Sequence, residues 1–301
     1  MQCPKCGLAY ETQPAECTRC GIVIAKFLRT QEAALPRPPD AASQADADLD
    51  DARLEREDAR QELRARAVAL PSALSFAWVA VRTAPGPVRL LAMWAHESGH
   101  AVAAWLCGFS AWPGPWFTPV GSERSPSLTV LLAGGLIYGG FRAWQQARWF
   151  RLAVCGVTLG LALVCTVMLR PGPAQQVIVF GGDAGCLVLG SAMMLTVYAR
   201  KEHPVRQGGV RWGLLVLGSL SFADAWAVWS GPLESLPFGE NENGLSDPSV
   251  LTEVYGWSVL LLVRRYMQLA GLCLAVLGAA WVTGMARAVA MLQGQSTRRW
   301  V

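Results

Sequence analysis

Charged residues are scarce in this sequence, since Asp, Glu, Lys and Arg together make up only 16% of its 301 residues. A typical soluble domain carries about a quarter charged residues, so an ordinary soluble protein is disfavoured. The net charge of +4 is too small to indicate a nucleic-acid partner, and none is expected. Histidine is rarer still, with three residues in the chain. No basic-then-apolar secretory signal is visible, because the sequence opens on a polar, cysteine-rich segment.

The charges that are present are unevenly placed along the chain. Residues 1–66 are polar and charged, whereas the sequence from Val88 onward is mostly apolar. This split predicts a small soluble head followed by a membrane domain. We therefore predict an all-α polytopic membrane protein with a zinc ribbon at 1–28, a disordered or helical linker at 29–69 and a membrane domain at 70–301.

About six apolar segments are candidates for crossing a bilayer, which takes roughly twenty residues. They are Val88–Phe109, Ser127–Phe141, Phe150–Leu169, Gln176–Ala199, Trp212–Ser230 and Tyr266–Ala288. With a cytosolic N-terminus, Lys and Arg concentrate in the cytosolic loops, while the opposite loop 231–257 is acidic and has neither. Because basic loops stay in the cytosol, this pattern predicts an integral, multi-pass membrane protein with both termini cytosolic.

The head contains two CxxC pairs, formed by Cys3, Cys6, Cys17 and Cys20. Each pair offers two sulfurs to one tetrahedral zinc ion, and a closed four-cysteine site is structural and not catalytic. Two disulfides or a redox pair are the alternative, which the absence of a visible signal peptide disfavours. The spacing therefore predicts a structural zinc ribbon in a reducing compartment, where it either binds a protein partner or simply folds.

A second metal-binding pattern lies within the first apolar segment, where His96-Glu97-Ser98-Gly99-His100 forms an HExxH motif. Residues four apart on a helix share a face, so both imidazoles can bind one zinc ion while Glu97 acts as the general base. Two hydrogen-bonding histidines beside a chance glutamate are the plain alternative. Ionisable groups are costly in a bilayer and usually functional there, so a catalytic zinc site is favoured.

An HExGH motif in the first apolar helix of a multi-span chain resembles the site-2-protease-like intramembrane metallopeptidases. Ser246-Asp247-Pro248 is similar to a Ser-Asp motif in a broader, poorly characterised branch of that family. The chain lacks the Asn-Pro-x-Asp-Gly element that supplies the third zinc ligand in better-known members. The resemblance implies a zinc metalloendopeptidase that cleaves membrane-protein or peptide substrates at the lipid bilayer, with one catalytic zinc ion besides the structural one.

The third zinc ligand is expected to be a carboxylate, because no spare histidine is available near the motif. Asp183 ranks first, since it lies at a depth similar to His96 and His100 and is flanked by glycines. Asp247 ranks second on the family resemblance, although a helix N-cap before a proline is its simpler interpretation. Asp224 lies at a comparable depth and is a further candidate for the third ligand.

Two other functions are also compatible with the sequence. The first is a catalytically inactive membrane scaffold that uses the zinc ribbon to bind a partner. The second is a transporter, since intramembrane His and Asp residues can form ion paths, although no inverted repeat is evident. Replacement of Glu97 by Gln distinguishes them, because only a protease loses cleavage while retaining its metal.

Overall fold

The computed structural model describes residues 1–12, 14–34, 41–199, 203–241 and 244–297. The chain divides into two compact units, Met1–Asp58 and Ala59–Val301. The division falls within helix α2, which runs from Ala41 to Thr83 and contains Pro71. Part of the predicted disordered linker, residues 35–40, lies outside the described residues. The domain boundaries predicted at residues 28 and 69 stay predictions.

The first unit contains two short backbone knuckles followed by helix α1 (Ile24–Ala34). Each knuckle is closed by an isolated antiparallel bridge, Gln2 with Ala9 and Glu16 with Val23. Gly7 and Gly21 adopt positive φ angles of 72° and 67°. Glycine has no Cβ, so it takes this left-handed conformation without strain. The two CxxC segments therefore turn in the same way.

The second unit is predominantly helical. After α2, its helices are α3 (Pro85–Leu106), α4 (Pro126–Gln145), α5 (Trp149–Leu163), α6 (Pro171–Leu195), α7 (Val210–Trp229), α8 (Asp247–Ser249) and α9 (Val259–Thr297). Shorter helical turns are the π-helical Val164–Met168 and Val250–Val254 and the 3-10 turns Thr196–Tyr198, Pro204–Gly209 and Leu233–Ser235. Two antiparallel hairpins depart from the all-helical prediction: β1 (Phe109–Ala111) with β2 (Val120–Arg124), and β3 (Glu240–Asn241) with β4 (Gly244–Leu245).

Among the described residues, four helices are long and apolar enough to cross a bilayer. They are Trp149–Met168, Pro171–Tyr198, Val210–Trp229 and Val259–Ala290. The first two predicted spans correspond to α3 and α4, which do not reach that hydropathy, so the count of six is not confirmed. In α3 the reason is visible in the sequence, since Arg89 and the HExxH motif interrupt its apolar residues.

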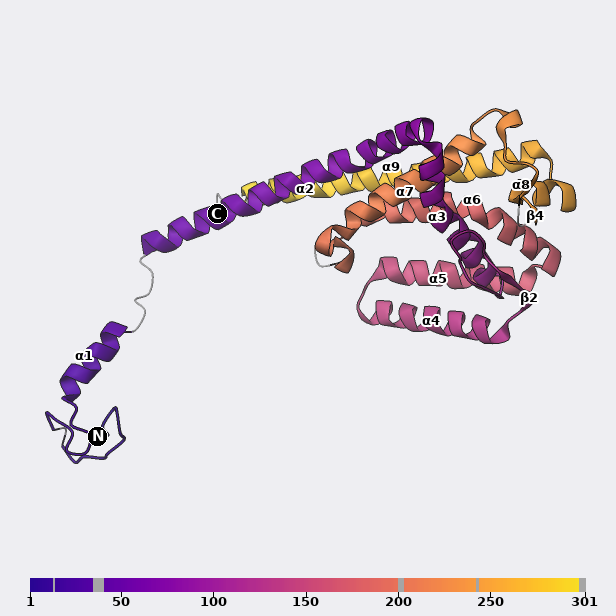
Figure 1. The fold of residues 1–301 in the computed structure, drawn as a ribbon. Coiled ribbons are helices and arrows are strands. Elements are labelled where there is room, and N and C mark those ends of the chain that lie inside the picture. The colour runs from indigo at the N-terminus through magenta and orange to yellow at the C-terminus, as the bar shows by residue number, and fades with distance from the viewer. Residues whose placement is uncertain (13, 35–40, 200–202, 242–243, 298–301) are drawn as a thin grey trace. The chain divides into compact units, whose positions relative to one another are not determined.

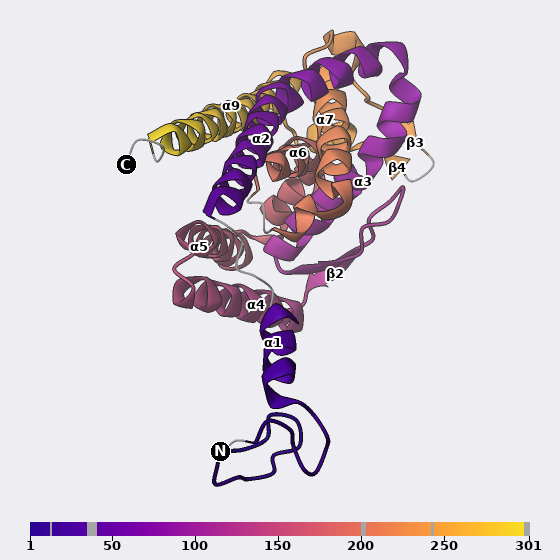
Figure 2. The same ribbon diagram turned by 90° about the vertical axis from the view of Figure 1, so that its left-hand side faces the viewer.

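Helix α3 packs against α6 and α7, and α6 in turn packs against α7 and α9. Figures 1 and 2 show α4 and α5 lying side by side next to this group. The α3–α6 contact is unusually close. A Cβ atom added at Gly99 would lie 2.1 Å from the Gly181 carbonyl oxygen and 2.6 Å from the Gly185 Cα. Small residues allow such close approach between helices in membranes, and here they bring the HExxH helix against α6.

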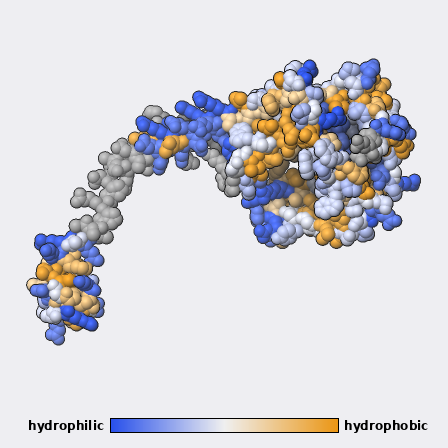
Figure 3. Space-filling view, viewed as in Figure 1, coloured by the Kyte–Doolittle hydropathy of each residue, from blue (hydrophilic) through white to orange (hydrophobic). Residues whose placement is uncertain are grey.

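The core of this unit and its outer surface differ in character. Trp229 and Tyr266 are almost fully buried, and their rings stack with centroids 4.1 Å apart. By contrast, Leu131 on α4, Val157 on α5 and Leu260 on α9 are more than 60% exposed. Figure 3 shows hydrophobic residues of this kind on the outside of the unit. Exposed apolar side chains on long helices are expected for a surface that faces lipid, and the chain is an integral membrane protein.

Candidate metal centre

The two histidines of the HExxH motif lie one turn apart on α3 and point towards α6. Their side chains are 19% (His96) and 12% (His100) exposed, so both are largely shielded from solvent. Their rings meet edge to face, with centroids 4.8 Å apart. Gly182 provides the room beneath them, since a Cβ there would lie 2.5 Å from His96 Cε1 and 2.6 Å from His100 Nε2. A side chain at position 182 would therefore occupy the space that the two rings fill.

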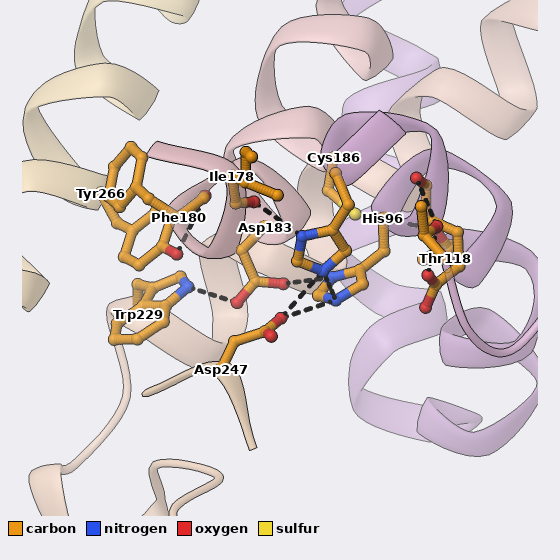
Figure 4. A network of polar contacts seen from close by, with 12 residues as sticks. His96, Thr118, Ile178, Phe180, Asp183, Cys186, Trp229, Asp247 and Tyr266 are labelled. Carbon is orange, nitrogen blue, oxygen red and sulfur yellow. Dashed lines mark hydrogen bonds and ion pairs between the residues drawn. The ribbon is translucent and has the colours of Figure 1, made fainter. Parts of the chain in front are cut away.

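Three ligand-type atoms converge between these rings. The Nε2 atoms of His96 and His100 lie 3.2 Å apart, and Asp247 Oδ2 lies 3.1 Å from each of them. Figure 4 shows the Asp247 carboxylate pointing at His96 from the same side as Asp183, opposite Thr118. Asp247 begins the short helix α8, directly after the β3–β4 hairpin. Two ligands of a tetrahedral zinc ion with bonds of about 2.0–2.1 Å are separated by about 3.3 Å, so the three atoms have a suitable spacing.

The opposite nitrogen of each imidazole has a partner of its own. His100 Nδ1 lies 2.8 Å from the carbonyl oxygen of Ile178, which can only accept a proton. His96 Nδ1 lies 3.0 Å from Oδ1 of Asp183. Both Nδ1 atoms therefore act as donors, and a neutral imidazole then presents a lone pair at Nε2. Two lone pairs and a carboxylate oxygen that face one another repel. A cation bound between them would turn this repulsion into attraction.

Asp183 is itself held in place by a buried aromatic residue. The indole Nε1 of Trp229 donates to Asp183 Oδ2 over 2.8 Å. Trp229 stacks on Tyr266, whose hydroxyl donates to the Phe180 carbonyl oxygen over 3.1 Å. Figure 4 shows this series from Tyr266 through Trp229 and Asp183 to His96. A histidine ligand whose second nitrogen binds a fixed carboxylate has its ring orientation and tautomer set.

The Asp247 carboxyl lies outside the four long apolar helices, and its charge state follows from these contacts. Burial raises the pKa of Asp247, but His100 and His96, when protonated, donate hydrogen bonds from Nε2 and lower that pKa more strongly, so it lies well below the usual value. A metal ion bound to the two Nε2 atoms would supply the positive charge in place of those protons. The side chain is 29% exposed. Asp247 is therefore an ionised oxygen donor, which is the form that binds a metal ion.

Glu97 lies beside the histidines on α3 and is buried. The Thr118 hydroxyl lies 2.7 Å from Glu97 Oε2 and 2.9 Å from the Glu97 carbonyl oxygen. Thr118 belongs to the loop between β1 and β2, and Figure 4 shows it on the side of His96 away from Asp183. Glu97 lines the same cavity as both histidines. A carboxylate is therefore available next to the three converging atoms.

A cavity of about 620 Å³ opens onto these groups. Its lining includes the three aspartates that the sequence singled out as candidate ligands, Asp183, Asp224 and Asp247. Within the described part of the chain, Asp224 belongs to none of the clusters whose ligand atoms lie within 4.8 Å of one another. Arg89 also lines the cavity. The cavity thus extends from the metal-type cluster to Asp224 and Arg89.

Cys186 on α6 also lies close to the centre. Its sulfur belongs to a cluster with His96 and Asp183 whose ligand atoms lie within 4.8 Å of one another. The thiol contacts the Ala92 carbonyl oxygen at 3.6 Å. A thiol that donates to a carbonyl retains its proton, whereas zinc binds the thiolate. The position three residues after Asp183, on the same face of α6, was the available sequence signal.

The four N-terminal cysteines form a separate cluster in the first unit. Their sulfurs all lie within 4.8 Å of one another, with 3.7 Å between Cys3 and Cys20 and 3.7 Å between Cys6 and Cys17. Zinc–sulfur bonds of about 2.3 Å place two tetrahedral thiolate ligands about 3.8 Å apart. The Tyr10 hydroxyl donates to the Cys17 sulfur over 2.8 Å and lowers the pKa of Cys17 to about 6. The cluster is consistent with a zinc ribbon.

Comparison with known proteins gives one family match. Residues 69–111 match the family model described as Peptidase M50B-like, which covers the end of α2, all of α3 and strand β1. No curated protein and no solved structure matches the chain. The matched segment contains His96, Glu97 and His100, and peptidases of this type use zinc. The chain is therefore an integral membrane protein with a Peptidase M50B-like segment of the site-2-protease type and a four-cysteine cluster consistent with a zinc ribbon.

Proposed function

We propose that this protein is an intramembrane zinc metalloendopeptidase, with one catalytic zinc site and one structural zinc site. The observation that carries the proposal is the convergence of His96 Nε2, His100 Nε2 and Asp247 Oδ2 at separations of 3.1–3.2 Å. Three protein ligands are typical of catalytic zinc sites, which keep one further position open. The family match to residues 69–111 supports the same reaction class.

We further propose that Asp247 supplies the third ligand. The sequence ranked Asp183 first, but the Asp183 carboxylate faces Nδ1 of His96 and the indole of Trp229. Asp247 faces Nε2 of both histidines, which is the side where a shared ion would lie. In this assignment Asp183 orients His96, as carboxylates behind zinc-binding histidines do in other metal sites.

The residues around the site have separate roles in peptide hydrolysis. When bound, zinc polarises a substrate carbonyl and lowers the pKa of water to about 7. Glu97 is the general base, which takes a proton from the attacking water and passes it to the departing amine. His96 and His100, held by Asp183 and the Ile178 carbonyl, keep their lone pairs directed at one point.

The surroundings of the site indicate the substrate class. The cavity lies among α3, α6 and α7 and is lined by apolar residues such as Met93, Trp116 and Phe117. An intact helix hides its carbonyl groups in hydrogen bonds, so a membrane-protein segment must unwind before a peptide bond reaches Glu97. We propose an unwound segment of a membrane protein as substrate. In this proposal the ribbon binds a protein partner, and both termini lie in the cytosol.

The test is a comparison of wild type with Glu97→Gln in the full chain. Membranes from cells that produce each protein are compared by mass-spectrometric mapping of protein N-termini, and Glu123→Gln, an exposed glutamate on β2, is the matched control. We expect new N-termini within or beside apolar segments in wild type and Glu123→Gln, and their loss in Glu97→Gln. Zinc per purified chain should stay equal in all three.

Two results would overturn the proposal. Identical N-termini in wild type and Glu97→Gln, at equal abundance of the two proteins, would leave the inactive scaffold as the better description. Unchanged zinc content after His96→Ala, measured with the ribbon disabled by Cys17→Ser and Cys20→Ser, would remove the metal centre itself.

A further inference from the structure

The loop between β1 and β2 has a preset conformation. Its sequence, Trp112-Pro-Gly-Pro-Trp-Phe-Thr-Pro119, contains three prolines, each of which fixes φ near −65°. At Gly114 an added Cβ would lie 2.4 Å from the Phe117 carbonyl oxygen, so the chain folds back closely on itself there. The backbone N–H of Trp112 donates to the Pro119 carbonyl oxygen over 3.3 Å and closes the loop. The loop is therefore a rigid unit with little freedom to lose.

The hairpin that carries this loop is fastened to its surroundings at two places. The indole Nε1 of Trp105 on α3 donates to the Ala111 carbonyl oxygen over 3.0 Å. At the other strand, Arg124 donates to the Cys107 carbonyl oxygen over 3.1 Å and to the Leu169 carbonyl oxygen over 2.6 Å. These bonds tie the hairpin to the end of α3 and to the segment before α6. The position of the loop over α3 is thus fixed from both strands.

The rigid loop places one hydroxyl group on the Glu97 carboxylate. Thr118 and Glu97 are only 6% and 5% exposed, and the Thr118 Oγ1 atom lies 2.7 Å from Glu97 Oε2. A hydroxyl has one proton, shared here between this carboxylate oxygen and the Glu97 carbonyl oxygen at 2.9 Å. Among the side chains that the structure describes, Thr118 is the hydrogen-bond donor to the Glu97 carboxylate. Removing it would take away this hydrogen bond from a buried carboxyl group.

We propose that Thr118 is a positioning residue for the general base, which fixes the Glu97 carboxylate in the direction of the reacting water. The inference rests on the proposed peptidase function. Its neighbours Trp116 and Phe117 line the same cavity and are 59% and 57% exposed, so the loop that holds Glu97 is also a wall of the substrate site. The rigidity of the loop is then part of the catalytic geometry, because a base that can turn away loses its hydrogen bond to the water.

A purely structural role is the competing explanation, since the same hydroxyl also contacts a carbonyl oxygen of α3. Two variants separate the roles. Thr118→Val keeps the shape and removes the donor, whereas Thr118→Ser keeps the donor and removes a methyl group. If Thr118→Val does not accumulate in membranes, Thr118→Ala takes its place. A packing role predicts that both substitutions lower the cleavage rate. A positioning role predicts that only Thr118→Val lowers it and that Thr118→Ser retains it.

The experiment uses isolated membranes that contain wild type, Thr118→Val, Thr118→Ser or Glu97→Gln. The probe is the set of wild-type-specific N-termini, and their rate of appearance is measured at pH 7. We expect Thr118→Val to lower the rate about ten- to a hundredfold, the usual effect of a lost hydrogen bond to a charged group. Thr118→Ser should stay within about threefold of wild type, with zinc unchanged.

The outcomes are distinguishable. A normal rate in Thr118→Val would overturn the positioning role while the peptidase function stands. An equal loss in the valine and serine variants, together with lost zinc, would also overturn it in favour of packing. If wild type and Glu97→Gln do not differ, the peptidase function fails, and the positioning role fails with it.

Discussion

The Oδ1 atom of Asp183 lies 3.0 Å from Nδ1 of His96, which joins α6 to the HExxH helix at the nitrogen that faces away from the converging ligand atoms. The two residues are 87 positions apart in sequence. They meet because Gly99, Gly181 and Gly185 let the two helices approach closely. The small-residue contact between α3 and α6 is thus what places a carboxylate behind a zinc-type histidine.

Asp183 and Asp247 are expected to differ in their effect on zinc binding. Asp247→Ala removes a proposed ligand, so the centre should retain no zinc after purification. Asp183→Asn keeps the ligands but loses the charge behind His96, so zinc affinity should fall about ten- to a hundredfold. Chelator competition on full chains with Cys17→Ser and Cys20→Ser measures both. The reverse order of effects would make Asp183 the third ligand.

Trp229 should influence the metal centre without touching it. Trp229→Phe retains an aromatic ring beside Tyr266 but removes the N–H that donates to Asp183 Oδ2. We expect zinc affinity to fall a fewfold, which corresponds to about the net free energy of one hydrogen bond. Trp281→Phe is the matched control, because the Trp281 indole donates instead to the Ala67 carbonyl oxygen over 3.0 Å. Equal zinc affinity in wild type and Trp229→Phe would show that the indole does not help to orient Asp183.

The sequence marks His96 and His100 as ligand candidates by their spacing, but it holds no comparable signal for choosing among the carboxylates, and the ligand assignment stays a prediction. Helical spacing alone puts His96 and His100 on one face, because residues four apart are neighbours on a helix. Depth along an axis favoured Asp183, and the structure does bring it to His96. Depth could not show that the β3–β4 hairpin leads the chain back to the histidines at Asp247, 151 residues after His96. Non-helical segments have no periodicity from which such a path follows.

Other features of the structure differ in how well the sequence predicts them. Thr118 and Trp229 reach the site through side-chain contacts across the fold, and nothing in their local sequence marks them. The four-cysteine cluster was predictable because both CxxC turns are short and local. The number of membrane spans was harder to predict. Helices α3 and α4 are helical as predicted, but their hydropathy lies below that of the four apolar helices. In α3, Arg89 and the HExxH residues lower the hydropathy of the helix that carries them.

Gly182 should be intolerant of any side chain. In Gly182→Ala the new methyl group would lie within 2.6 Å of both imidazoles, so the rings must move. We expect loss of zinc from the centre and a destabilisation of about 1–3 kcal/mol from overpacking. Gly134→Ala on α4 is the control, because a Cβ there meets nothing within 4 Å. Zinc content and melting temperature of the purified full chains measure the effect, and a Gly182→Ala variant with normal zinc would contradict it.

Glu62 on α2 should make stability depend on acid pH. Arg66 and Arg206 donate to its carboxylate over 2.8 and 2.6 Å. Burial raises the pKa of Glu62, but these two hydrogen bonds lower it more, so its pKa lies below the usual value. The stabilisation is complete above the unfolded-state pKa of about 4.3 and is lost as pH falls through the lower folded-state pKa. Glu62→Gln should cost about 1–3 kcal/mol at pH 7.

Melting temperatures of the full chain at pH 7 and at decreasing pH test this dependence. In Glu62→Gln the melting temperature should fall less as the pH is lowered. Glu253→Gln, at an exposed glutamate, should show the same fall as wild type. If the melting temperature falls equally at acid pH in all three proteins, the pH dependence arises from other groups.

The ribbon should contain one unusually reactive thiol once its metal is removed. Because Tyr10 donates its hydroxyl proton to the Cys17 sulfur, the pKa of Cys17 is lowered to about 6. In the zinc-stripped, reduced chain, alkylation of Cys17 by iodoacetamide should therefore rise with a midpoint near that pH, since the thiolate is the nucleophile. Tyr10→Phe should move the midpoint up towards the ordinary thiol pKa of about 8.5. Tyr138→Phe, on an exposed tyrosine of α4, should leave it unchanged. Mass spectrometry of the labelled peptide reads the midpoint, and one midpoint shared by wild type and Tyr10→Phe would show that the hydroxyl does not stabilise the thiolate.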